Sequence, residues 1–329
     1  MYTPVSIWVW LATLAALLAI FSLDLVVIAR RDHAVTIKDA TRWVIFYVSL
    51  ALAFGAGLFV FARPGAGGEF IAGYITEYSL SVDNLFVFLI IISRFAVPAL
   101  AVDKVLYIGI VLSLALRAVF IFAGAAAIAR FNWVFYIFGV FLIYTAVRLA
   151  MEGENDETDF QENFVLRTMR RVLPTTPDYA GESYTTRVDG RRLYTPLLIV
   201  IVAIGLANVI FAFDSIPAIF GLTKDPYIVF TANAFALMGL RQLYFLIGGL
   251  LDRISYLNIG LSVVLGFIGV KLILEALHGS GVDDLGPIHL PEIGIAVSLG
   301  VIIGTLAITT VASLIKSHYI RRRLPADSE

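Results

Sequence analysis

The sequence contains about nine apolar runs, each close to twenty residues long, and this pattern limits the fold more than any other feature. At a rise of 1.5 Å per residue, a helix of this length crosses roughly 30 Å of hydrocarbon. The strands of transmembrane barrels are about half as long. With 60% hydrophobic and only 15% charged residues, the chain has more apolar surface than a soluble domain can bury. We therefore expect an all-α, polytopic membrane protein.

The predicted spans lie near residues 5–28, 43–62, 70–93, 105–129, 132–150, 195–219, 227–250, 256–277 and 291–315. They divide the chain into a first membrane half at 1–150, a linker at 151–194, a second half at 195–315 and a basic tail at 316–329. Most of the 24 lysines and arginines then fall on one side of the membrane. By the positive-inside rule, the N-terminus is expected outside and the linker and C-terminus in the cytoplasm.

Two stretches on either side of the linker resemble each other, ITEYSLSVDNLFVF and LANVIFAFDSIPAI. In each, a polar residue precedes an aspartate by six positions: Glu77 before Asp83, and Asn208 before Asp214. The span after each stretch carries a further shared signal, LRAVF in the first half and LRQLY in the second. The chain therefore contains an internal repeat with two anchors in each half.

The repeated halves cross the membrane in opposite directions in the nine-span arrangement. This predicts a 3+3 inverted repeat, formed by spans 3–5 within residues 70–150 and spans 6–8 within 195–277. Inverted repeats are typical of secondary transporters, whose substrate sites lie near the middle of the membrane. The remaining three spans are expected at the periphery.

Asp83 and Asp214 each lie near the middle of an apolar run, where a charged side chain costs about 2.5–3.5 kcal/mol. One interpretation is structural, with protonated or hydrogen-bonded aspartates that hold helices together. The functional interpretation is favoured because an oxygen-bearing side chain, Asn84 or Ser215, follows each aspartate. Both residues of each pair are therefore candidate ligands.

Pro217 predicts a helix break beside Asp214. Proline has no N–H, so the carbonyl of Phe213 loses its usual helical donor. Gly205 and Gly221 lie on either side and would allow the helix to unwind, as in the broken helices of transporters. A free carbonyl next to a carboxylate would suit a cation.

The candidate metal ligands share one property, because all of them present oxygen: Asp83, Asn84, Asp214, Ser215, Glu77, Asn208 and the carbonyl of Phe213. Oxygen ligands are those that Mg²⁺, Ca²⁺ and Mn²⁺ prefer. Soft metals lack ligands here, since the chain has no cysteine and its four histidines lie outside or at the ends of the apolar runs. Glu77 lies six residues from Asp83 and on a different helix face, so we expect it to act as a gate or proton carrier.

Three further charged residues lie in or near the predicted spans. Arg117 and Arg241 are interpreted as counter-ions of the aspartates in the empty state, with an anion path as the alternative. Asp24 lies near the cytoplasmic end of the first span, where an interfacial salt bridge and a vestibule role are both open.

Other classes of function find little support. A net charge of −1 without an extended basic tract argues against nucleic-acid binding. The sequence has no HExxH, GxSxG or phosphate-loop motif and no histidine or cysteine within a span, so we do not expect an enzyme, and we expect no cofactor.

At these residues the sequence resembles the TerC/Alx family of bacterial membrane proteins, which is named for tellurium resistance and linked to manganese export within the LysE-type transporter superfamily. The resemblance covers almost the whole chain. Its segments are SLDLVVIARRDHAVTIKDA at 22–40, EYSLSVDNLFVFLIIISRFAVP at 77–98, FNWVFYIFGVFLIYTAVRL at 131–149 and VIFAFDSIPAIFGLTKDPYIVFTANAFALMGLRQLYFL at 209–246.

The resemblance implies that Asp83 and Asp214, with the residues that follow them, belong to the family's two functional motifs. It also implies Mn²⁺ or a similar divalent ion as the substrate and the bacterial inner membrane as the location. One position departs from the pattern, because relatives often have an acid where this chain has Asn208. Without that charge, the second half is expected to bind a cation or carry a proton less well than the first.

These observations together predict export of Mn²⁺ from the cytoplasm by alternating access, coupled to protons, with the ion held between Asp83 and Asp214. Two alternatives remain open. The first is a non-transporting membrane subunit, in which residues 151–194 recruit soluble cytoplasmic partners in a tellurite or metal stress response. The second is efflux of an oxyanion through the intramembrane arginines.

Overall fold

The computed structural model describes residues 5–29, 36–151, 174–176, 178–181, 183–188, 191–247, 256–282, 284–285 and 288–323. Its helices are α1 (Ile7–Ala29), α2 (Ile37–Phe61), α3 (Ala66–Arg94), α4 (Ala99–Arg130), α5 (Val134–Met151), α7 (Pro196–Phe220), α8 (Pro226–Leu237), α9 (Leu240–Ile247), α10 (Leu257–Gly279) and α11 (Ile295–Arg323). Within the described residues, eight helical stretches are long and apolar enough to cross a membrane, with α8 and α9 counted as one, and α1 adds a shorter apolar stretch. The all-α, polytopic membrane fold is confirmed.

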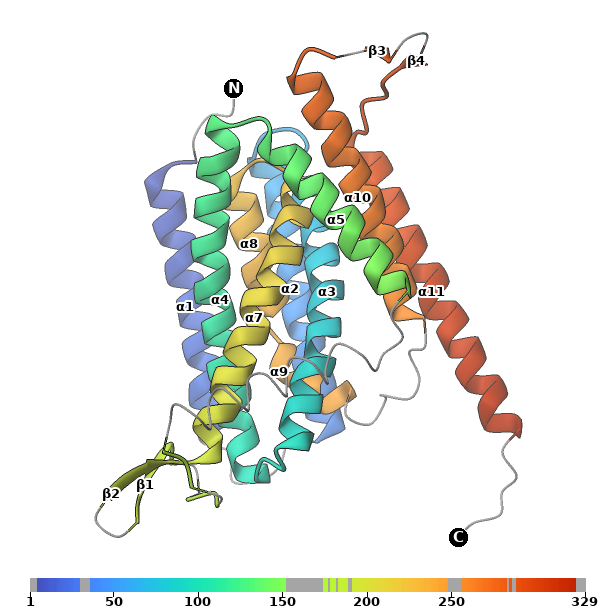
Figure 1. The fold of residues 1–329 in the computed structure, drawn as a ribbon. Helices are drawn as coiled ribbons and strands as arrows, with labels where there is room; N and C mark the ends of the chain where they lie inside the picture. Colours follow the sequence, from blue (N-terminus) through green and yellow to red (C-terminus); the bar gives the residue numbers. More distant parts are fainter. Residues whose placement is uncertain are drawn as a thin grey trace.

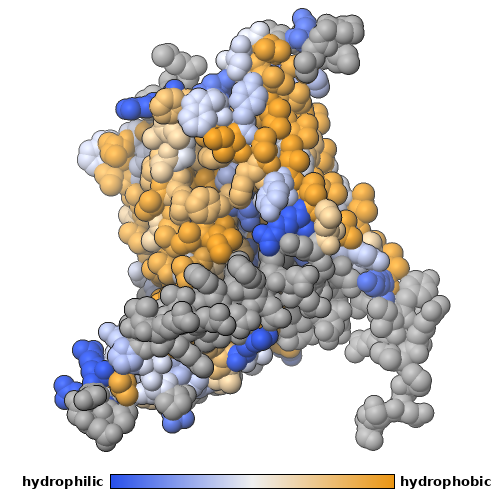
Figure 2. Space-filling model, viewed as in Figure 1, coloured by the Kyte–Doolittle hydropathy of each residue, from blue (hydrophilic) through white to orange (hydrophobic). Residues whose placement is uncertain are grey.

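The sides of the bundle are apolar, as a lipid-facing surface requires. Figure 2 shows hydrophobic residues over most of the coloured upper part of the visible side, with hydrophilic ones toward the two ends and in one cluster near mid-height. Large apolar side chains of α1 and α2 are widely exposed, for example Phe61 at 90%, Trp8 at 76% and Val60 at 73%. Because water would penalise such exposure, these side chains are those expected against acyl chains.

The helices start where the local sequence favours a start. The side chain of Thr36 accepts a hydrogen bond from the backbone N–H of Asp39 and caps α2. Asp225 caps α8 in the same way by accepting from the N–H of Tyr227 at 3.0 Å, and Pro226 follows it at the first helical position. Such caps satisfy backbone donors that the first turn leaves free.

The predicted helix break at Pro217 is wrong. Helix α7 continues through Pro217 to Phe220, because the proline lies within one turn of the C-terminal end and its own carbonyl accepts from the N–H of Gly221 at 3.0 Å. The break lies instead in the next span, between α8 and α9, where Gly239 has φ +83°. Glycine alone adopts that conformation without strain, which explains the residue at this turn.

Helices α3, α7 and α8 form the centre of the bundle. Every residue from Tyr227 to Leu237 in α8 is buried, and its apolar side chains pack with those of α2, α3 and α7 in one core cluster. Helices α5 and α10 cross beside this centre (Figure 1), and their backbones lie close together at Gly139 and Gly269. A Cβ at Gly139 would lie 2.8 Å from the carbonyl oxygen of Gly269, so only glycine allows this crossing.

The equivalent helices of the two halves run in opposite directions. In Figure 1, α3 descends while α7 ascends, α4 ascends while α8 and α9 descend, and α5 descends while α10 ascends. An inverted repeat requires these opposed directions. The 3+3 inverted repeat itself stays a prediction, because direction alone does not establish equivalent packing.

The last part of the predicted linker forms a hairpin at the lower end of the bundle (Figure 1), with β1 (Thr185–Val188) and β2 (Arg191–Tyr194) antiparallel. A second, two-residue pair, β3 (Asp284–Leu285) and β4 (Ile288–His289), follows α10. Just before the first hairpin, Tyr179 donates its hydroxyl to the carbonyl of Phe95 at 2.7 Å. Burial raises the pKa of Tyr179, which keeps the phenol protonated for this bond. The segment is therefore attached to the end of α3.

Candidate functional site

The candidate site lies along the line of contact between α3 and α7. A Cβ at Gly73 of α3 would lie 3.5 Å from Cγ2 of Ile219 on α7. Farther down, Phe88 of α3 and Ile204 of α7 both lie against Gly109 of α4. These two contacts fix which residues of the antiparallel helices face each other.

Counting from these contacts places Glu77 level with Ser215, because each lies four residues from the upper contact. It likewise places Asn84 level with Asn208, so that Asp83 lies near the level of Asn208. Asp214 is then about five residues, or roughly 7–8 Å, higher along the axis than Asp83. The two aspartates therefore belong to different levels of the membrane rather than to one plane.

Glu77 lies in a buried charge network. Its carboxylate forms an ion pair with Arg117 of α4, and the two side chains are 0% and 1% exposed. Nη1 of Arg117 also donates to Oδ1 of Asn233 on α8 at 2.7 Å, and Ser81 donates to Glu77 at 3.3 Å. Arg117 is thus a counter-ion, as predicted, but of Glu77 rather than of an aspartate.

Three oxygens at the level of Glu77 are buried without a hydrogen-bond partner among the described residues. They are Oε2 of Glu77, Oγ1 of Thr76 and Oγ of Ser215, and these three residues are at most 1% exposed. A buried polar atom without a partner costs about 1–3 kcal/mol. Several such oxygens on facing helices therefore indicate a position for a bound ion or water molecule.

Asp214 is half-buried and directed toward α5, where Thr145 donates its hydroxyl to Oδ1 at 3.2 Å. Its neighbour Phe213 is 50% exposed and packs against Phe120 on the outer face. Helix α7 is continuous here, so no unwinding exposes the carbonyl of Phe213. It remains a candidate ligand solely because Pro217 has no N–H to donate to it.

At the lower level, Asn208 donates its amide to the carbonyl of Gly109 at 3.0 Å, which ties α7 to α4. Asn84 is half-buried on α3. The side chain of Asp83 lies outside the described side chains, although its backbone belongs to the continuous helix α3. Since α3 does not break, Glu77 and Asp83 stay about 9 Å apart along the helix axis and cannot share one metal shell.

The other predicted charges lie elsewhere. Arg241 of α9 forms an ion pair with Asp103 of α4 at 3.0 Å, which joins these two helices. The side chain of Asp24 is outside the described part of the chain. Across the described residues, no three His, Cys, Asp or Glu side chains gather closely enough to hold a metal ion. A cation here would therefore rely on hydroxyl and amide oxygens as well as carboxylates.

Three residues of this region were not singled out from the sequence: Thr76, Thr145 and Asn233. Asn233 could have been found, since it is an isolated amide within an apolar run. The two threonines could not, because threonine is common in membrane helices and its partners come from the fold.

Comparison with known proteins matches residues 62–321 to the model of the integral membrane protein TerC family. A Myxococcus xanthus protein described as an uncharacterized membrane protein is 44% identical over 94% of this chain and 93% of its own length. An uncharacterized membrane protein of Mycobacterium tuberculosis is 46% identical, over 93% and 78%. The Escherichia coli protein named "Putative membrane-bound redox modulator Alx" is 39% identical over 94% of both chains. No solved structure matches the chain.

Proposed function

The chain belongs to the integral membrane protein TerC family, and from this premise we propose that it exports a hard divalent cation, with Mn²⁺ as the cation, by alternating access. The observation that carries the proposal is the group of buried, unpartnered oxygens on Thr76, Glu77 and Ser215, next to Asp214. In a membrane interior such polar groups are costly, and they mark substrate or ion pathways.

The chemistry of this group favours a hard cation. All of its atoms are carboxylate or hydroxyl oxygens, and the chain has no cysteine to offer a soft metal. Thiol–disulfide chemistry is likewise unavailable to this chain, so the redox role in the name of its relatives would have to act here by another route.

The two levels suggest how the cation passes through the bundle. We propose Asp83, Asn84 and Asn208 as the ligands of the lower position, and Asp214, Ser215 and Glu77 as those of the upper one. With the lower end in the cytoplasm, as the distribution of Lys and Arg predicts, a cation enters at Asp83 and leaves past Asp214. Opposed repeats that rock against each other would expose the positions in turn.

Arg117 gives Glu77 a resident positive charge when no cation is bound. Because Asn233 also accepts from Arg117, the guanidinium keeps one partner when Glu77 turns toward a cation. A proton on Glu77 could neutralise its carboxylate in place of Arg117 or of the bound cation. Outward movement of two charges against 100 mV costs about 4.6 kcal/mol, and we propose inward proton flow as its source.

Purified protein in liposomes tests this function. Uptake of Mn²⁺, Mg²⁺, Ca²⁺ and Zn²⁺ should be compared with and without a pH gradient across the membrane. We expect Mn²⁺ uptake that increases with the gradient and Zn²⁺ uptake that is lower. Flux that equals empty liposomes for all four ions would remove the transport proposal.

The attachment of the hairpin to α3 favours a second candidate, a non-transporting subunit that presents the linker to soluble partners. Replacement of residues 152–173 by a glycine–serine linker of the same length leaves the chain long enough to reach the hairpin, and it separates the two candidates. A transporter should retain flux, whereas a scaffold should lose its role in tellurite or metal stress. Oxyanion efflux is the weaker alternative, because Glu77 already neutralises Arg117.

A further inference from the structure

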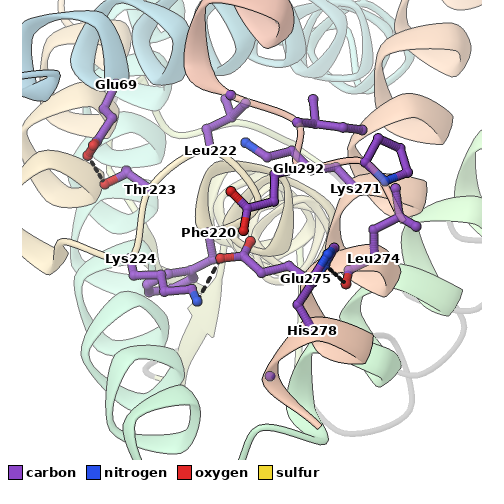
Figure 3. A pocket seen from close by; sticks show the side chains of 14 residues that line it. Glu69, Phe220, Leu222, Thr223, Lys224, Lys271, Leu274, Glu275, His278 and Glu292 are labelled. Carbon is purple, nitrogen blue, oxygen red and sulfur yellow. Dashed lines mark hydrogen bonds and ion pairs between the residues drawn. The ribbon is translucent and has the colours of Figure 1, made fainter. Parts of the chain in front are cut away.

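A cavity of about 520 Å³ lies at the upper end of the bundle, between the α7–α8 loop, α10 and residues 291–294 (Figure 3). Phe220 and Leu222 line it and are 1% and 6% exposed. Asp214 lies six residues before Phe220 in α7, or roughly 9 Å along the axis. The cavity is therefore separated from the upper cation position by little more than this apolar layer.

The α7–α8 loop, residues 221–225, is fastened to α3 on one side. Thr223 donates its hydroxyl to Oε2 of Glu69 at 2.5 Å. Arg63 in turn donates to both carboxylate oxygens of Glu69, at 2.8 and 2.6 Å. The bidentate contact fixes Glu69 as an acceptor for the loop.

On the other side the loop is fastened to α10. Nζ of Lys224 lies 2.6 Å from Oε1 of Glu275, and the two side chains are 37% and 33% exposed. Lys271, one turn before Glu275, donates to Ser298 of α11 instead. Figure 3 shows the end of Lys224 in contact with the carboxylate of Glu275 at the cavity. This ion pair is partly solvated, and such pairs break at little cost.

We propose that the α7–α8 loop is the outer gate of the cation path, that the cavity is its exit vestibule, and that Lys224–Glu275 is the latch. The inference rests on the proposed transport function. The loop joins the helix that carries Asp214 to the central helix α8, so movement of these helices moves the loop. Release of Lys224 from Glu275 lets the loop leave α10 and joins the vestibule to the level of Thr76 and Ser215.

The absence of cysteine from the chain gives a direct test. Thr76→Cys is nearly isosteric and places a single thiol beneath the gate, at a residue that is 1% exposed. The reagent is a membrane-impermeant, positively charged methanethiosulfonate added outside intact cells. In the Thr76→Cys background, the labelling rate of Glu275→Gln is compared with that of Glu292→Gln, an acid that lines the same cavity outside the latch.

We expect Glu275→Gln to raise the labelling rate about two- to fivefold, as the loss of a partly exposed ion pair allows. Glu292→Gln removes the same charge near the reagent and should leave the rate unchanged. Exchange of the pair, Lys224→Glu with Glu275→Lys, should return the rate to the reference value. Equal labelling rates for Glu275→Gln and Glu292→Gln would overturn the proposal that the α7–α8 loop is a gate.

Labelling does not require transport, so the two proposals can fail separately. Mn²⁺ flux is measured in liposomes for the same variants without the cysteine. Flux in the unmodified chain together with unchanged labelling in Glu275→Gln refutes the gate alone. Faster labelling in Glu275→Gln with no flux in any form supports an opening loop and refutes the transport function.

Discussion

Glu77 of α3 and Arg117 of α4 form an ion pair that is almost completely buried, and Asn233 of α8 accepts from the same guanidinium. Helices from both halves of the chain therefore meet at one charge network. Buried ion pairs contribute little net stability, because desolvation offsets their attraction. The presence of this pair in a membrane interior therefore favours a role in function over a role in stability.

The pair predicts a large stability difference between single and double variants. Arg117→Gln leaves the Glu77 carboxylate buried without its counter-ion, and we expect a loss of about 3–5 kcal/mol in the free energy of unfolding. The double variant Glu77→Gln with Arg117→Gln removes both charges and should recover most of this loss. Thermal unfolding in detergent measures both, and equal losses would contradict the pairing.

Asn233 should stabilise the fold mainly by accepting a hydrogen bond from Arg117, and less by its packing. Asn233→Ala removes an acceptor from a buried guanidinium, and we expect a cost of about 1–3 kcal/mol. Thr231→Val is the matched control, since Thr231 is equally buried on α8 but, among the described residues, donates to its own helix, at Tyr227 and Ile228. The control should lose less than half as much in the same unfolding measurement.

Much of the fold could be predicted from the sequence because it depends on local properties. Apolar runs of membrane-spanning length determine the helices, and the predicted spans agree with the observed ones to within several residues at most ends. The break at Gly239 was missed, although a glycine after Met238 in an apolar run is a weak signal for it. The break expected at Pro217 did not form, because a proline near a helix end removes only one hydrogen bond.

The site was predictable by residue type but not by partner. Glu77, Arg117 and Ser215 were found as polar residues within apolar runs, and they lie buried at the centre. Which acid pairs with which arginine depends on helix register, which a single sequence does not contain. The separate levels of the two aspartates also follow only from the contacts between α3 and α7.

Gly239 should tolerate no side chain. Its φ of +83° is unfavourable for other residues, and a Cβ would lie 2.9 Å from Cδ2 of Tyr47. We expect Gly239→Ala to cost at least about 1–2 kcal/mol in unfolding free energy. Gly266→Ala is the control, because its Cβ would meet Ala146 at an ordinary 3.6 Å. If both variants unfolded at the same temperature, the left-handed conformation of Gly239 between α8 and α9 would be contradicted.

Thr145 should support Asp214 as a positioning residue. Thr145→Val keeps the shape and removes the hydroxyl that donates to Asp214. We expect a severalfold weaker apparent affinity for Mn²⁺ in liposome uptake, corresponding to about 1 kcal/mol for one hydrogen bond. Thr145→Ser retains the hydroxyl and should behave as the unmodified chain. A change in maximal rate alone, with affinity unchanged, would contradict the role.

The central claim, that a cation passes through the bundle at Asp214, is tested most directly by Mn²⁺ flux in liposomes containing Asp214→Asn. Asparagine can still accept from Thr145, so this contact is kept, and thermal unfolding of the variant is measured alongside flux to show that it is folded. Asp284→Asn in β3, an exposed residue outside the spans, serves as the control and should keep full flux. We predict that Asp214→Asn reduces flux to the level of empty liposomes; flux equal to that of the control in a folded protein would contradict the account.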